Sequence, residues 1–212
     1  MSIRLWVSAL KLQEIKDWRG SKKKELLNEL LEKLDGIMPD GEIEEEDAEL
    51  KVLAREKLEA YINGTLKAQE EPETTVEVLS VYSMALQAET NPWEDHEVEL
   101  EWAYGDLDEL YRDCLPRFQG TEHLLEHIIG GRPFLATDFD PESNLYSFLN
   151  NGEIKDLASK MQEVYSQCAE IVDAGDLNEQ DFDSGVLDTM EYMLSALTVA
   201  AESGDDIFIF FS

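Results

Sequence analysis

Five residues of the chain, His123 to His127, carry the side-chain types of a zinc site. They read H-x-x-E-H, with Glu126 beside the second histidine, which is the pattern of inverted zinc proteases. Histidines four residues apart share one helix face and can bind one zinc ion, while a nearby glutamate activates the bound water. The third ligand would be Glu191 or Glu202. A zinc-dependent hydrolase, with Glu126 as its catalytic residue, is therefore the alternative function that the sequence raises.

A plain helix explains the same stretch with fewer assumptions. Thr121 can begin a short helix that Gly130-Gly131 ends, and Leu124, Leu125 and Ile128 then share an apolar face. A pattern with three fixed positions often arises by chance. We therefore favour a structural helix and predict no catalytic residue, no cofactor and no metal ligand.

Other candidates for chemistry are weaker than the histidine pair. The acidic run 138–144 begins like a calcium-binding loop, but Ser143 stands where that loop needs glycine and Leu149 where it needs glutamate. The acidic run 173–183 lacks the spacing as well. Neither a GxSxG nucleophile motif nor a glycine-rich phosphate loop occurs. A small-molecule sensor, the third class we consider, would use the aromatic residues Trp93, Trp102, Tyr104 and Tyr111.

Apolar residues at helical spacing recur along most of the chain. Leu26, Leu30 and Leu34 mark a helix that we expect Ser21 to cap and Gly36 to end. Further helices are expected at about 42–62, 74–86, 107–115, 121–130, 154–168 and 186–201. Most of the chain is therefore expected to be helical.

A strand is expected at each end of the chain. Residues 3–10, IRLWVSAL, alternate between apolar and other side chains, which is the pattern of a strand. Residues 206–211 are almost continuously apolar, which is typical of a strand buried on both faces inside a sheet. The segment 132–150 is interpreted as loop-rich. We therefore predict an α+β fold, predominantly helical, with a small sheet that includes both terminal strands, in a single domain over 1–212.

The charge of the chain is strongly negative. Lys and Arg total 17 and Asp and Glu total 48, which gives a net charge of −31. No Lys or Arg follows Lys160, although twelve acidic residues do. Such a field repels nucleic acid and anionic membranes and attracts a basic protein partner. We therefore expect no nucleic acid and no membrane as partners.

The two cysteines and the first residues of the chain bear on where in the cell the protein is expected to be. Cys114 and Cys168 lie far apart without CxxC spacing, and we expect both to be reduced and buried. Residues 1–10 lack the features of a secretory leader, and no stretch approaches the ~20 apolar residues of a membrane span. We expect a cytoplasmic protein of bacterial type.

The order of several segments resembles a known family. The chain opens with IRLWVSALKLQEI, carries VYSMALQAE in its middle, continues with GGRPFLATDFDPESNLYSFLNNGEIKDL and closes with YMLSALTVAAESGDDIFIFF. This arrangement resembles a bacterial domain-of-unknown-function family and is similar in outline to the YfbM-like proteins. The resemblance implies an α+β fold and supplies no catalytic residues.

Charge and the lack of catalytic motifs lead to the functional expectation. A stable acidic protein without chemistry suits a role that depends on binding another protein. We expect a non-catalytic protein of the immunity-protein or regulatory-adaptor type that binds a basic protein.

Overall fold

A computed structural model describes residues 4–37, 39, 45–65, 101–132, 146–173 and 184–211. The chain divides into two compact units. The sheet unit comprises Met1–Leu10, Pro92–Arg132 and Asn144–Ser212, and the hairpin unit comprises Lys11–Asn91 and Pro133–Ser143. That residues 1–212 form a single domain stays a prediction. The helix expected at 74–86 and the acidic runs 138–144 and 174–183 lie outside the described residues.

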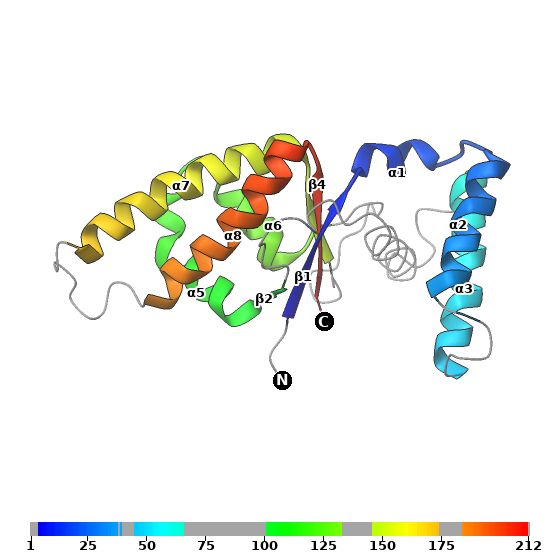
Figure 1. Cartoon of the computed structure of the whole chain (residues 1–212), viewed down its shortest axis with the longest axis horizontal. Helices are drawn as coiled ribbons and strands as arrows, with labels where there is room; N and C mark the ends of the chain where they lie inside the picture. The colour runs from blue at the N-terminus through cyan, green and yellow to red at the C-terminus, as the bar shows by residue number, and fades with distance from the viewer. Residues whose placement is uncertain are drawn as a thin grey trace. The chain divides into compact units, whose positions relative to one another are not determined.

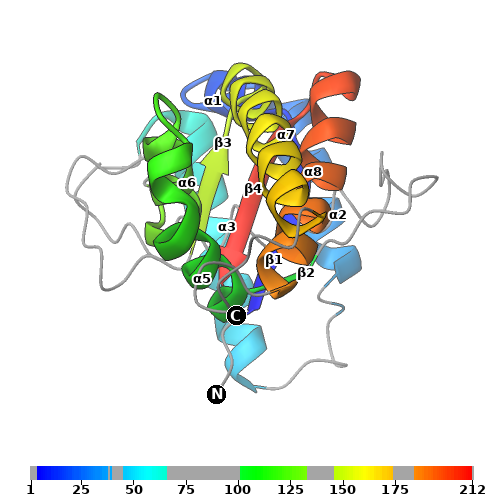
Figure 2. The same ribbon diagram turned by 90° about the vertical axis from the view of Figure 1, so that its left-hand side faces the viewer.

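The sheet unit is built on four antiparallel strands in the order β2-β1-β4-β3 (Figures 1 and 2). Their bounds are Arg4–Leu10 for β1, Glu101–Ala103 for β2, Tyr146–Leu149 for β3 and Asp206–Phe211 for β4. In the central pair β1 and β4, Val7 lies opposite Ile209. The two terminal strands are therefore the two inner strands of one sheet. The sequence predicted that both belong to the sheet, and that the C-terminal strand lies inside it.

Strand β4 is buried on both faces of the sheet. Ile207 and Ile209 belong to the core, and Phe208, which points to the opposite face, is only 5% exposed. On β1 burial alternates over the first four residues, with Leu5 and Val7 buried and Trp6 half exposed, whereas Ser8 and Ala9 are both buried. The continuous apolar run, and the alternating run over its first four residues, thus have the burial that their sequence patterns predict.

Helices cover one face of this sheet (Figure 2). Their bounds are Tyr104–Cys114 for α5, Glu122–Gly130 for α6, Asn151–Asp173 for α7 and Ser184–Ser203 for α8, with the 3-10 turn η1 at Leu115–Arg117. Their apolar stripes form one core with the sheet, in which Leu107, Leu125, Leu157 and Leu197 are almost fully buried. Burying each such side chain stabilises the fold by about 2 kcal/mol.

The hairpin unit contains three helices, α1 (Leu12–Trp18), α2 (Lys24–Ile37) and α3 (Glu45–Asn63). The pair α2 and α3 has a small core of its own, made of Leu30, Leu34, Ala54, Leu58 and Ile62. On its surface Asp35 forms two ion pairs: its Oδ1 lies 2.8 Å from Lys51 Nζ and 2.7 Å from Arg55 Nη2. The hydrogen bonds from Lys51 and Arg55 lower the pKa of Asp35, which stays charged between them.

The expected start of α2 is wrong. Ser21 does not cap the helix, which begins three residues later at Lys24. Lys22 has a left-handed backbone (φ 55°), and its N–H donates to the Ile62 carbonyl at 3.0 Å. This bond turns the chain before the helix can begin, and a tertiary contact of this kind overrides a local capping signal.

The end of α3 agrees with the sequence. Gly64 has φ 70°, its N–H donates to Tyr61, and the Thr65 N–H donates to Ala60, which is a Schellman motif. The Gly20 backbone crosses here, so that a Cβ placed on Gly64 would lie 2.9 Å from the Gly20 Cα. Glycine is therefore required at position 64 for both backbone conformation and space.

The observed fold class is α+β and mainly helical, as predicted, with both terminal strands in the sheet. Two strands were not located from the sequence: β2, and β3 within the segment that was interpreted as loop-rich. Both are too short to show a clear period of two. Among the described helices, none has the length and apolar character needed to cross a membrane.

Candidate functional site

Helix α6 carries the histidine pair on a short amphipathic frame. Leu124, Leu125 and Ile128 are buried against the core, which fixes this face of the helix. Thr121 stands at the N-cap position, but its hydroxyl donates to the Phe118 carbonyl at 3.1 Å. The helix thus has the apolar face that the structural interpretation predicted, and the side chain of Thr121 does not accept a capping N–H.

The two histidines lie on neighbouring turns of α6. The ring centroids of His123 and His127 are 6.0 Å apart and the rings are perpendicular. His123 is exposed, whereas His127 is partly buried. Burial first, and then the positive charge of Arg132, lower the pKa of His127, so its imidazole is neutral at neutral pH. A neutral imidazole is the form that binds metal, but it is also the form that packs in a core.

The catalytic candidate Glu126 has a structural partner. Its Oε1 accepts a hydrogen bond from the Tyr111 hydroxyl at 3.2 Å, which joins α6 to α5. Burial and the negative charge of Glu126 raise the pKa of Tyr111, so the phenol keeps the proton it donates. The carboxylate therefore ties two helices together at the surface.

The proposed third ligands lie on α8. Glu191 and Glu202 are both exposed there. Within the described part of the chain, no three His, Cys, Asp or Glu side chains gather closely enough to hold a metal ion. The zinc hypothesis and the prediction that no metal binds both remain predictions.

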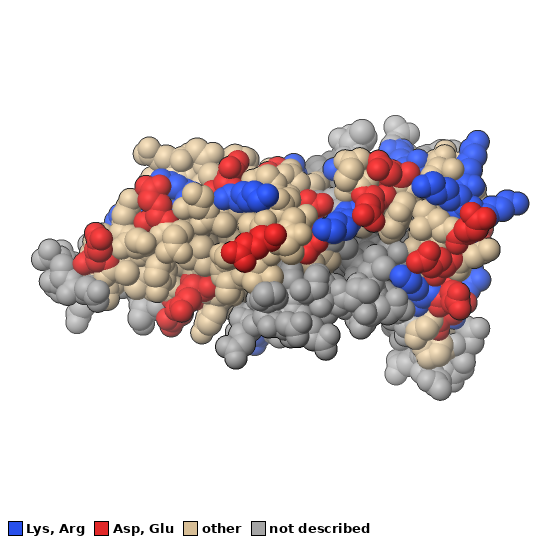
Figure 3. Space-filling model, turned by 45° about the horizontal axis from the view of Figure 1, so that its top comes forward, with Lys and Arg blue, Asp and Glu red and all other residues tan. Residues whose placement is uncertain are grey.

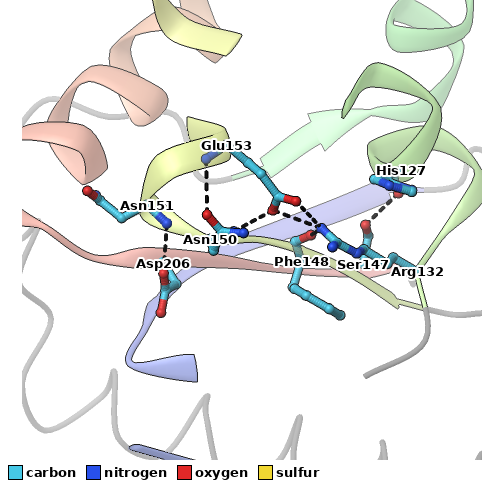
Figure 4. Close-up of polar contacts among 8 residues, drawn as sticks. All are labelled: His127, Arg132, Ser147, Phe148, Asn150, Asn151, Glu153 and Asp206. Atoms are coloured by element: carbon cyan, nitrogen blue, oxygen red, sulfur yellow. Dashed lines mark hydrogen bonds and ion pairs between the residues drawn. The ribbon is translucent and has the colours of Figure 1, made fainter. Parts of the chain in front are cut away.

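A polar junction that the sequence analysis missed lies where α6, β3 and α7 meet (Figure 4). Arg132 Nη1 lies 2.8 Å from both carboxylate oxygens of Glu153, and its guanidinium lies 4.4 Å above the Phe148 ring. The Ser147 hydroxyl donates to the His127 carbonyl, which attaches α6 to β3. The ion pair is only about a quarter exposed on either side.

Glu153 also takes part in the N-terminal cap of helix α7. Its Oε2 accepts the Asn150 N–H at 2.9 Å, and its own N–H donates to Asn150 Oδ1 at 3.1 Å. This reciprocal pair is a capping box. Burial alone would raise the pKa of Glu153, but the hydrogen bonds from Arg132 and Asn150 outweigh it and lower the pKa. The pattern Asn-x-x-Glu before an apolar run was the signal in the sequence that predicts this cap.

Asn151 joins the start of α7 to the end of α8. Its backbone N–H donates to Asp206 at 2.8 Å (Figure 4). Its side-chain amide donates to the carbonyls of Ala200 and Asp205 at 3.0 and 2.9 Å. One side chain therefore adds donors to two carbonyls, one in the last turn of α8 and one just after the helix. Together with the Arg132–Glu153 pair, it gives the junction a structural role.

Helix α8 presents carboxylates on its outward side. Asp188, Glu191 and Glu202 are separated by three and eleven residues, which puts them on one helix face, and all three are exposed. Tyr192, 49% exposed, lies on the same face. We call these four residues the acidic face of α8. The other side of the helix is buried through Val186, Met190, Met193, Ala196, Leu197 and Ala200.

Charge is unevenly distributed between the elements. In Figure 3, most of the visible Lys and Arg belong to the hairpin unit, where Asp and Glu lie among them, whereas the sheet unit shows Asp and Glu with few Lys or Arg. Helix α8 contains no Lys or Arg at all. Its carboxylates therefore have no cation on their own helix.

The aromatic residues proposed for a sensor pocket belong to the core where they are described. Trp102 is 4% exposed, and Tyr104 and Tyr111 pack partly buried against the core of the sheet unit. Trp93 lies outside the described residues. The described aromatics thus have a packing role.

Comparison with known proteins gives no match: no protein family, no curated protein and no solved structure matches the chain. The resemblance to YfbM-like proteins stays a prediction.

Proposed function

We propose that this chain is a non-catalytic cytoplasmic protein that binds a basic protein, as an immunity protein or a regulatory adaptor does. The acidic face of α8 carries this proposal: three exposed carboxylates share a helix face with a half-exposed tyrosine, on a helix without cations. Tyrosine is a frequent energetic centre of protein interfaces, and its ring attracts the guanidinium or ammonium groups of a partner.

The rigid support behind this face favours binding without rearrangement. The apolar side of α8 is fully buried at Met190, Met193 and Leu197, and the end of the helix is held by Asn151. A preformed surface loses little conformational entropy on association. Opposite charge on the partner would raise the association rate.

An affinity experiment tests the proposal. The full chain is immobilised, exposed to an extract of the cells that make it, and washed with rising salt. Two variants with equal charge change are compared. One combines Asp188→Asn, Glu191→Gln and Glu202→Gln on α8, and the control combines Glu14→Gln, Glu25→Gln and Glu32→Gln in the hairpin unit, all exposed positions.

The expected result is a basic protein that the native chain and the control variant retain, that salt releases, and that the α8 variant fails to retain. Capture that is indifferent to salt, or equal for both variants, would contradict the proposal. So would the absence of any basic protein among those retained.

A further inference from the structure

Asparagine followed directly by glycine occurs twice in the chain, as Asn63-Gly64 and as Asn151-Gly152. In such a pair the backbone nitrogen of the glycine can attack the amide side chain of the asparagine, because glycine carries no side chain that would hinder the approach. The structure holds the two asparagine side chains in very different ways. This difference decides which pair reacts in the folded protein.

Asn151 is held in place at the start of α7. Its side-chain nitrogen donates to the carbonyls of Ala200 and Asp205 at 3.0 and 2.9 Å, and its backbone N–H donates to Asp206 at 2.8 Å. The residue is also partly buried. The amide carbon can reach the Gly152 nitrogen only after the side chain has left both carbonyls, so the folded sheet unit protects this pair.

Asn63 has no such protection. It is the last residue of α3, its side chain is exposed, and that side chain makes no hydrogen bond to another described residue. The Gly64 N–H donates to the Tyr61 carbonyl at 3.1 Å, in the final turn of the helix. Helix ends open locally at a low cost in free energy. Opening of this one turn is therefore enough to bring the Gly64 nitrogen to the Asn63 side chain.

We propose that Asn63 is a site of spontaneous deamidation, which converts it into aspartate and isoaspartate while the protein stays folded. The Gly64 nitrogen attacks the side-chain carbonyl carbon of Asn63 and gives up its proton. The bond from that carbon to the amide nitrogen breaks, ammonia leaves, and a succinimide ring remains. Water then opens the ring at one of its two carbonyls, so that one product is aspartate and the other is isoaspartate. Water is the co-reactant, and the reaction needs neither an oxidant nor a reductant.

The modified residue lies next to a corner that joins α1 to α3 in the hairpin unit. The Tyr61 carbonyl accepts the Gly20 N–H at 2.9 Å as well as the Gly64 N–H, and the Tyr61 hydroxyl donates to the Ile15 carbonyl at 2.8 Å. Isoaspartate lengthens the backbone by the side-chain methylene, between the Cα of residue 63 and the Gly64 nitrogen, which displaces Gly64 from this corner. Either product also adds a negative charge at the C-terminal end of α3, where the helix dipole is already negative. Deamidation therefore loosens the hairpin unit, independently of what the acidic face of α8 binds.

Peptide mapping by mass spectrometry tests this inference on the full chain after storage at mildly alkaline pH. The expected result is the mass shift from amide to acid at residue 63, with isoaspartate identified by electron-transfer fragmentation, and several-fold less conversion at residue 151. The same chain stored in urea is the matched control. Unfolding removes the protection of Asn151, so both asparagines should then react at similar rates.

Three outcomes would overturn the inference. The first is conversion of Asn151 as fast as that of Asn63 in the folded chain. The second is an Asn63 that stays intact in the folded chain although it reacts in urea. The third is the same preference for Asn63 in urea as in the folded chain, which would show that the structure does not set it.

The variant Asn63→Gln tests the consequence for the hairpin unit. Glutamine forms the corresponding larger ring far more slowly, and the exposed position loses no hydrogen bond to a described residue. During storage the wild type is expected to lose hydrogen-exchange protection around Gly20 and Tyr61, whereas the variant keeps it. Equal loss in both proteins would contradict a role of Asn63, and the mapping of the wild type decides the site itself even if the variant folds poorly.

Discussion

At the scale of single residues, the Arg132–Glu153 pair connects the end of α6 with the start of α7. Arg132 touches the Glu153 carboxylate through one nitrogen and covers the Phe148 ring, so a charged and an apolar contact coincide on one guanidinium. The same Glu153 carboxylate also accepts the Asn150 N–H in the N-terminal cap of α7. A partly buried residue with two such roles is expected to matter for stability more than an exposed carboxylate does.

Replacing Glu153 by glutamine separates these two roles. Glutamine can still accept the Asn150 N–H in the capping box, but it loses the charged bond to Arg132. We expect Glu153→Gln to lower the free energy of unfolding by about 1–2 kcal/mol at neutral pH. Asp156→Asn, an exposed change one turn further along α7, is the control and should alter stability by less than about 0.5 kcal/mol.

The pH dependence of this effect has a definite sign. The folded-state pKa of Glu153 lies below the ordinary value of 4.5, so the unfolded chain binds the proton more tightly. The stabilisation is therefore complete above that value and is lost as the pH falls through the folded pKa. Urea unfolding from about pH 7 down to about pH 3 should show the difference between wild type and Glu153→Gln shrinking. A constant difference would show that the charge is not its source.

The histidine pair permits a direct test of the alternative function. Protein purified without a histidine tag is expected to contain much less than one zinc ion per chain, and His123→Ala is expected to change neither metal content nor fold. His123 is exposed and contacts His127 edge to face, so little packing is lost. One zinc per chain that disappears in folded His123→Ala would favour the hydrolase instead.

At the scale of elements, the end of α3 depends on a glycine. Gly64→Ala must adopt a positive φ and bring its Cβ to 2.9 Å from the Gly20 Cα. We expect it to destabilise the hairpin unit by about 1–3 kcal/mol. Gly36→Ala is the matched control, because a Cβ at this position within α2 meets nothing within 4 Å, and it should stabilise by up to about 1 kcal/mol. Thermal unfolding of both variants by circular dichroism measures the contrast, and equal Tm values for the two would contradict it.

Long periodic elements were predictable from the sequence, and short ones were not. Helices α7 and α8 were predicted from apolar residues at helical spacing. The end of α3 was predicted from Gly64, which follows the last apolar position of that helix. Strand β3 has only four residues, and its pairing with β4 is a long-range contact that local pattern does not encode. The start of α2 was misplaced for a similar reason, because the Lys22 N–H bonds to Ile62 on another helix.

The same distinction holds for the candidate sites. The apolar face of α6 and the burial of Cys168 followed from helical periodicity, and the burial of Cys114 was expected as well. The pair Arg132–Glu153 joins residues 21 positions apart in the chain, so it depends on how the elements pack. Of the junction, the capping box alone has a local sequence pattern.

At the scale of the whole molecule, charge is the property on which binding of a basic partner depends. The chain carries −31, but the described basic side chains are concentrated early, with Lys16, Arg19 and Lys22–Lys24 before or at the start of α2. Helix α8 has none. A basic partner should therefore be steered to the α8 side of the sheet unit, and its association should be faster at low ionic strength.

The association rate constant of the captured basic partner, measured over a series of salt concentrations, tests this claim most directly. We predict a rate that falls steeply with salt for the native chain and for the variant with Glu14, Glu25 and Glu32 neutralised. The dependence should be markedly shallower for the variant with Asp188, Glu191 and Glu202 neutralised. A rate that does not change with salt, or one slope shared by all three proteins, would contradict the account.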